Sequence, residues 1–227
     1  MNAVTVVGVV GLAIVSITTH EAAHGLMADR LGDPTARERG RLTLNPIPHI
    51  DLFFTILLPL FLILSRSGFI FGGAKPVPVD VSRLRNPRRD WALVGAVGPG
   101  ANVLIALGLA AMLSAATLTG LADASSSLTE ILAIGIFLNA LLAVFNLIPI
   151  PPLDGSRVVQ YFLTGEARAL YGRLDRFGLL LILAVVYFVP QLQVPISGAI
   201  FCLIEIITTP FGVAAVVEGV LRSTRFG

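Results

Sequence analysis

Long runs without a charged side chain constrain the fold of this 227-residue chain more than any other feature. A helix needs about 20 apolar residues to cross the hydrocarbon core of a bilayer. Four runs contain no Asp, Glu, Lys or Arg: residues 1–19, 91–122, 131–153 and 177–204. Pro190 and Pro195 interrupt the last run, so we expect one helix to end there and another to begin, continuing through Glu205 to about Leu221.

The composition supports a membrane protein. Charged residues make up 13% of the chain, about half of what soluble domains carry, and the mean hydropathy is +0.86. These values exclude a soluble enzyme, a disordered chain and a coiled coil, and the single Cys202 excludes a disulfide scaffold. The net charge of +2 gives no reason to expect a nucleic-acid partner. We expect one membrane domain over residues 1–227, with a catalytic core at about 1–165 and C-terminal helices at about 166–227.

The basic residues predict how the chain crosses the membrane. Short loops rich in Arg and Lys stay in the cytoplasm. The connections near 120–130 and 190–195 contain no basic residue, whereas the other connections do. We therefore expect these two connections and the N-terminus outside, and the other connections inside, in a multi-pass protein of the cell (plasma or inner) membrane.

Residues 52–65 form a weaker apolar run, with Pro59 at its middle and basic loops on both sides. If both loops are cytoplasmic, the segment is a re-entrant hairpin and not a span. The alternative is an ordinary sixth span, which would leave one basic loop on the outer side of the membrane. Irregular backbone at membrane depth has to be buried or line a watered cavity. The predicted fold is an all-α polytopic membrane protein with five to six transmembrane helices and a short membrane-embedded β/hairpin region between the first two spans.

His20-Glu21-Ala22-Ala23-His24 is the motif that carries chemistry. His20 and His24 are four residues apart, so both imidazoles project from one helix face and can hold one Zn²⁺. Glu21 can then accept a proton from a water molecule that the zinc activates. Ionisable side chains inside an apolar helix are costly unless they pair or bind something. The alternative is three polar residues that merely end the first span.

A catalytic zinc site needs a third protein ligand and an open position. Asp154 is the best carboxylate, because the proline-rich stretch before it prevents a regular helix and the predicted topology places it on the same membrane face as His20. Asp154 could instead be the N-cap of an amphipathic stretch at 156–163, and both roles could coexist. His49 is a weaker candidate for a ligand, and a surface loop position suits it better.

At these residues the chain resembles the site-2 protease family of intramembrane zinc metalloproteases, in particular its short bacterial and archaeal members without a PDZ domain. The resemblance covers about residues 8–165. It rests on His20–His24, on Gly98-Pro99-Gly100-Ala101-Asn102, and on Asn146 through Gly155, with further similarity at 31–36, 40–46 and 74–79.

The resemblance implies a protease that cuts the transmembrane helix of a protein substrate within the bilayer, near the cytoplasmic side. It implies His20, His24 and Asp154 as ligands of one zinc per chain, and Glu21 as catalytic base. It further implies that Asn102 and Asn146 hold substrate or stabilise the oxyanion; the alternative for each asparagine is a hydrogen bond between packed helices.

A substrate helix must unwind before its peptide bond is accessible, and a strand edge could receive it. Arg41–Asn45 and residues 69–79 are the segments expected to form such an edge. Two other functions fit the sequence less well. One is an inactive scaffold that binds transmembrane helices, and the other is a zinc transporter, although the chain shows no internal repeat of the kind transporters often have.

Overall fold

The computed structural model describes residues 1–57, 61, 64, 72–123, 125–178, 180–182, 184 and 189–224. Four helices in these residues are long and apolar enough to cross a membrane: α1 (Ala3–Arg30), α4 (Pro87–Leu118), α5 (Ser127–Asn146) and α9 (Gln193–Thr208), which continues into the 3₁₀ turn η6 (Thr209–Phe211). This confirms the all-α class of the predicted fold. A fifth and a sixth span are not confirmed.

The hairpin expected of residues 52–65 is not confirmed either. Leu52–Leu57 form a π-helical turn, η2, and the segment's remaining residues lie outside the described part of the chain, apart from Phe61 and Leu64. The helix expected before Pro190 also falls largely outside the described residues.

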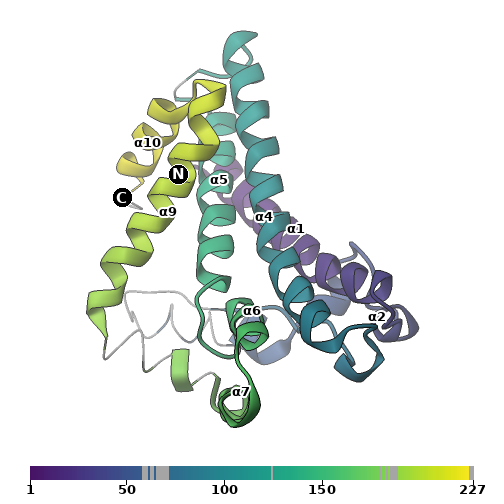
Figure 1. Ribbon diagram of the computed structural model, residues 1–227. Helices are drawn as coiled ribbons and strands as arrows, with labels where there is room; N and C mark the ends of the chain where they lie inside the picture. Colours follow the sequence, from purple (N-terminus) through teal and green to yellow (C-terminus); the bar gives the residue numbers. More distant parts are fainter. Residues whose placement is uncertain are drawn as a thin grey trace.

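α1 and α5 run in the same direction and α4 runs against them (Figure 1). Two hydrogen bonds join the N-terminal ends of α1 and α5: Asn2 Nδ2 donates to Ser127 Oγ over 2.8 Å, and Thr5 Oγ1 donates to Glu130 Oε2 over 2.7 Å. Caps begin both helices, because Asn2 accepts from the Thr5 amide and Ser126 from the Thr129 amide. The C-terminal ends of α1 and α5 therefore lie on one side of the molecule.

The last helix differs from the one expected to run to Leu221. α9 ends at Thr208, and a separate helix, α10 (Ala214–Ser223), turns back onto the bundle. Pro210 cannot continue the hydrogen-bond ladder, and Gly212 takes a left-handed conformation with a φ of 69°, which a glycine adopts without strain. α10 buries Val217 and Leu221 in the core formed with α4, α5 and α9.

The described part of the connection between α1 and α4 contains four short helical turns: α2 (Thr35–Glu38), η1 (Ile47–His49), η2 and η3 (Val81–Arg83). Neither Arg41–Asn45 nor residues 72–79 form one of the expected edge strands, and residues 69–71 of the second segment lie outside the described residues. Pro76 and Pro78 have no amide hydrogen to give to a ladder. Backbone groups of this segment bind side chains instead of a neighbouring strand. Arg41 donates to the Lys75 and Pro76 carbonyls, and Glu21 accepts from the Val77 amide.

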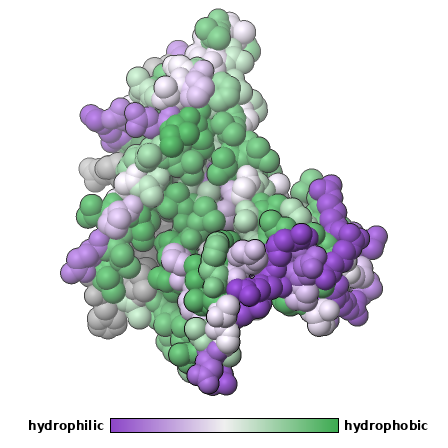
Figure 2. Space-filling view, viewed as in Figure 1, coloured by the Kyte–Doolittle hydropathy of each residue, from purple (hydrophilic) through white to green (hydrophobic). Residues whose placement is uncertain are grey.

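The remaining short helices close the end of the bundle that carries Asp154: α6 (Asp154–Phe162), α7 (Gly165–Arg173), η4 (Leu174–Phe177) and η5 (Pro190–Leu192). Hydrophobic side chains cover most of the face over α4, α5 and α9, while hydrophilic residues gather over α2 and the adjoining end of α1 (Figure 2). Val7, Leu104 and Ile206 are each more than 60% exposed, as expected of side chains that face lipid.

Candidate metal centre

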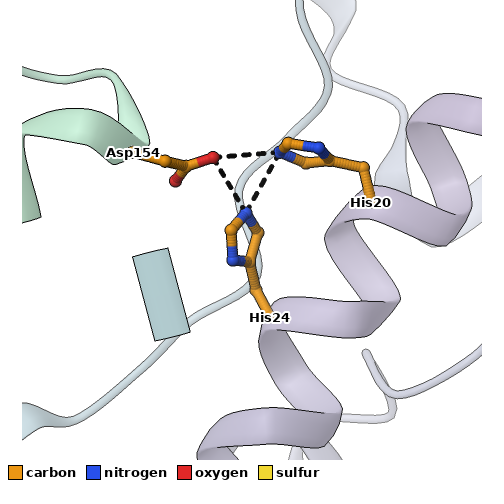
Figure 3. A group of neighbouring side chains, drawn as sticks. All are labelled: His20, His24 and Asp154. Atoms are coloured by element: carbon orange, nitrogen blue, oxygen red, sulfur yellow. Dashed lines mark hydrogen bonds and ion pairs between the residues drawn. The ribbon is translucent and has the colours of Figure 1, made fainter. Parts of the chain in front are cut away.

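Three potential metal ligands meet where α1 and α6 approach each other (Figure 3). His20 Nε2 and His24 Nε2 are 3.1 Å apart, and each lies 3.1 Å from Asp154 Oδ2. All three residues are at least 94% buried. Ligand atoms about 2.0–2.1 Å from a tetrahedral zinc lie roughly 3.3–3.4 Å from one another, so this triangle has the size of one face of a zinc site.

The hydrogen bonds of His24 determine which of its ring nitrogens carries a proton. His24 Nδ1 lies 2.6 Å from the carbonyl oxygen of Val94 on α4. A carbonyl oxygen only accepts, so Nδ1 must donate, and the neutral ring then presents the lone pair of Nε2 to the other ligands.

A buried chain of amides determines the proton position of His20 in the same way. On α5, Asn139 Nδ2 donates to the Gly135 carbonyl over 2.9 Å and to Ser16 Oγ on α1, so Asn139 Oδ1 is left to accept. Asn102 Nδ2 on α4 donates to that oxygen over 3.0 Å. Asn102 Oδ1 therefore faces His20 Nδ1 at 2.6 Å and accepts its proton in a hydrogen bond.

The two imidazoles and the carboxylate consequently point three lone pairs at one another. Neither Nε2 of the neutral rings has a proton to share with its neighbour or with Asp154 Oδ2. Three electron-rich atoms in a buried space repel one another unless a cation lies between them. This set of donors, two imidazoles and one carboxylate, is a common ligand set of catalytic zinc, and it fits the metal.

Asp154 is the first residue of α6, and its carboxylate lies beside His20 and His24 and does not cap the helix. The N-cap position belongs to Leu153, and no side chain caps the helix, so the N-cap alternative for Asp154 is wrong. Arg157 forms an ion pair with the other carboxylate oxygen, Oδ1, over 3.0 Å, and its guanidinium lies 4.5 Å from the ring centre of Trp91. Burial would raise the pKa of Asp154, and the positive charge of Arg157 acts in the opposite direction.

Three glycines allow the helices around His20, His24 and Asp154 to pack closely. A Cβ atom at Gly98 of α4 would lie 2.5 Å from His24 Cε1 and 2.7 Å from His20 Cε1. At Gly95 it would meet Arg157 Cβ at 2.8 Å, and at Gly155 it would overlap the Leu147 carbonyl oxygen. The ligand-bearing helices can approach α4 and the end of α5 only because these positions carry no side chain.

The other predicted site residues lie around this group. Glu21 is half-buried, is not one of the converging ligands, and accepts the Val77 amide over 2.9 Å. Asn146, at the end of α5, donates to the Leu142 carbonyl one turn earlier. The substrate roles of Asn102 and Asn146 stay predictions; the contacts of Asn102 are with His20 and Asn139.

His49 and Glu205 take no part in the ligand group. His49 is 3% exposed, so it is not the surface histidine that its loop position suggested, and its Nε2 contacts the Thr43 carbonyl. Glu205 is exposed on α9, and no hydrogen bond or ion pair to its side chain occurs among the described residues.

Sequence reasoning missed Asn139, Arg157 and the Val94 carbonyl. A single Asn in an apolar run offers no sign of its partner, and a backbone carbonyl offers none at all. Arg157 could have been found, because it lies three residues after Asp154 and so on the same helix face.

Replacing Asn139 should weaken zinc binding although Asn139 lies two hydrogen bonds from the metal ligand. Asn139→Leu leaves the Asn102 amide without its acceptor and frees Asn102 to rotate, so the proton of His20 is no longer directed to Nδ1. We expect zinc affinity to fall about 10–100-fold, as is usual when such an outer contact is lost, measured by competition with a chelator at fixed pH. Ser16→Ala is the control, because Gly135 still orients Asn139. Equal losses in both variants would contradict the relay.

Comparison with known proteins agrees with this site. The model of Peptidase family M50 matches residues 114–189, which include Asp154 but not the His20–His24 motif. The protein "Putative zinc metalloprotease YwhC" of Bacillus subtilis (strain 168) is 39% identical over 175 residues, covering 76% of both chains. Rip2 of Mycobacterium tuberculosis (strain ATCC 25618 / H37Rv), which has the same description, is 31% identical over 193 residues, or 85% of this chain and 71% of Rip2.

No solved structure matches the chain significantly. The extent and identity of the match to YwhC nevertheless show the family, and the zinc that these relatives' descriptions name agrees with a group of His20, His24 and Asp154 that could hold a metal ion. This chain therefore belongs to peptidase family M50, the site-2 protease family of zinc metalloproteases.

Proposed function

We propose that the protein is an intramembrane protease that hydrolyses peptide bonds within or near the transmembrane segments of membrane-protein substrates. The depth of the ligand group supports this most directly. His20 lies ten residues before the end of α1, and at 1.5 Å per residue that places it about 15 Å from the helix terminus. A metal group at this depth in a membrane-spanning helix is suited to a substrate inside the bilayer.

In this proposal His20, His24 and Asp154 hold one zinc, which when bound supplies a Lewis acid for the scissile carbonyl and lowers the pKa of a water molecule. Glu21 is the general base and takes the proton of the attacking water at its carboxylate. The Val77 amide fixes the orientation of that carboxylate. Arg157 holds Asp154 Oδ1, so that Oδ2 alone is directed at the two histidines.

The rest of the proposal follows from topology. Residues 1–227 form one protease domain in the cell membrane, with the N-terminus outside and the metal site nearer the cytoplasm. The absence of basic residues from the 120–126 connection, at the end of the molecule away from Asp154, supports this orientation. The partners are the lipid bilayer and a protein with a transmembrane helix.

Cleavage of a single-span protein substrate in detergent or in proteoliposomes tests this function. We expect the wild type to cut within or next to the span, with the cut mapped by mass spectrometry. A chelator should stop the reaction, and stoichiometric zinc should restore it. Cuts confined to extramembrane loops would overturn the intramembrane assignment. A zinc-loaded protein that leaves a panel of such substrates intact would support the inactive scaffold instead.

A further inference from the structure

A cavity lies in the connection between α1 and α4. It is open to solvent, has a volume of about 380 Å³, and is lined by Arg39, Arg41, Lys75, Pro76 and Pro78. Its lining therefore contains three cationic side chains and no acidic one. Arg39 and Arg41 follow α2 in the sequence, and hydrophilic residues gather on the surface over α2 (Figure 2).

Arg41 is the most informative residue of this cavity, because its side chain is buried and has no acidic partner among the residues that the structure describes. The residue is only 9% exposed. Its Nη2 donates to the Lys75 and Pro76 carbonyls over 2.7 Å and 3.4 Å, whereas its Nε is buried with no hydrogen-bond partner. A buried cation is unfavourable unless a negative charge compensates it, so this arrangement favours an anion in the cavity.

The neighbouring acidic side chains are engaged elsewhere. Asp29 pairs with Arg37, and Glu38 pairs with Arg83. Asp33 accepts from Thr35 and from the Asp80 amide. No ion pair of Arg39, Arg41 or Lys75 occurs within the described part of the chain, which leaves three positive charges facing one open volume.

We propose that this cavity is a phosphate-binding site, and that in the membrane the phosphate is the headgroup of an anionic phospholipid. A forked guanidinium matches the oxygens of a phosphate, and Lys75 adds a point charge. The cavity lies in the connection that follows α1, at the end of a membrane-spanning bundle, where headgroups are found. Basic pockets at the cytoplasmic ends of spans suit anionic lipids. Free phosphate offers the same chemistry, so the test separates the two sources.

The protein in a nonionic detergent free of lipid is titrated with inorganic phosphate by calorimetry. In a second arm, native mass spectrometry counts retained lipid after addition of phosphatidylglycerol or phosphatidylcholine. We expect the wild type to bind one phosphate and to retain one phosphatidylglycerol, with phosphatidylcholine retained at least tenfold more weakly. The double variant R39Q/K75Q changes two exposed side chains and should weaken both phosphate and phosphatidylglycerol at least tenfold.

The matched control is R85Q/R168Q, which removes the same charge from two residues that do not line the cavity. It should bind like the wild type, and unchanged melting temperatures in phosphate-free buffer show that both double variants fold. Equal binding by R39Q/K75Q and the control would overturn the site. Binding of inorganic phosphate without selective retention of phosphatidylglycerol would overturn the lipid as its source. Neither arm depends on proteolysis, so failure of the proposed function would leave this result intact.

Discussion

Gly98→Ala should deprive the protein of zinc, although the change adds a single methyl group. That methyl would lie 2.5 Å from His24 Cε1 and 2.7 Å from His20 Cε1, well inside contact distance. The metal tolerates ligand displacements of only about 0.2 Å, so α4 or the imidazoles would have to move further than the site allows. We expect zinc affinity to fall about 100-fold and proteolysis to fall with it, measured as zinc per chain after dialysis and as the cleavage rate.

Two other glycines of α4 serve as matched controls for this experiment. A Cβ atom at Gly100 or Gly108 would meet nothing within 4 Å, so alanine should be accommodated there and should favour the helix. Full zinc occupancy in Gly98→Ala would show that the ligands lie elsewhere. An equal loss in Gly100→Ala would show that α4 is merely sensitive to added bulk.

Glu21→Gln should abolish cleavage while leaving zinc in place. The amide has nearly the shape of the carboxylate, and its oxygen can still accept the Val77 amide, so the local structure should persist. It cannot take a proton from water, and loss of a general base costs about 10²–10⁴ in rate. The measurement is the single-turnover cleavage rate together with zinc content in the same preparation.

The matched variants for this prediction are His24→Ala and Asp154→Ala, which should lose both zinc and activity. Glu21→Gln that holds zinc and cleaves at the wild-type rate would remove Glu21 from the mechanism. If Glu21→Gln lost zinc as well, Glu21 would be a ligand and not the base.

Much of the metal site could be predicted, because the spacing of two residues on a helix is a local property and the direction of each span follows from the charges of its own loops. A spacing of four residues, as between His20 and His24, puts two side chains on one face of any α-helix. The charge pattern predicted that α1 and the span before Asp154 run in the same direction, and the contacts at both ends of α1 agree. The all-α class followed from charge-free runs long enough to cross a bilayer, because a backbone in lipid has few alternatives to a helix.

What could not be predicted depends on contacts between distant segments. Asn139 binds Asn102 and Ser16 from another helix, and nothing in its neighbours indicates that partner. Asp154 fits the N-cap pattern in sequence, but its carboxylate lies beside the histidines of α1 and forms an ion pair with Arg157. The break after α9 had a local signal in Pro210 and Gly212, which the apolar run concealed.

The paired N-terminal ends of α1 and α5 bear on how the protein responds to its membrane. Helices adapt to a thicker or thinner bilayer by changing tilt, and a slide of one residue along a neighbour moves a side chain by about 1.5 Å. Asn2 and Thr5 hold α1 to Ser127 and Glu130 near its N-terminus, and His20, ten residues before the C-terminus of α1, lies against Asp154 in the segment after α5. Because they are joined at these two levels, we expect the two helices to tilt together, so that hydrophobic mismatch changes the tilt of the pair and does not displace His20 relative to Asp154.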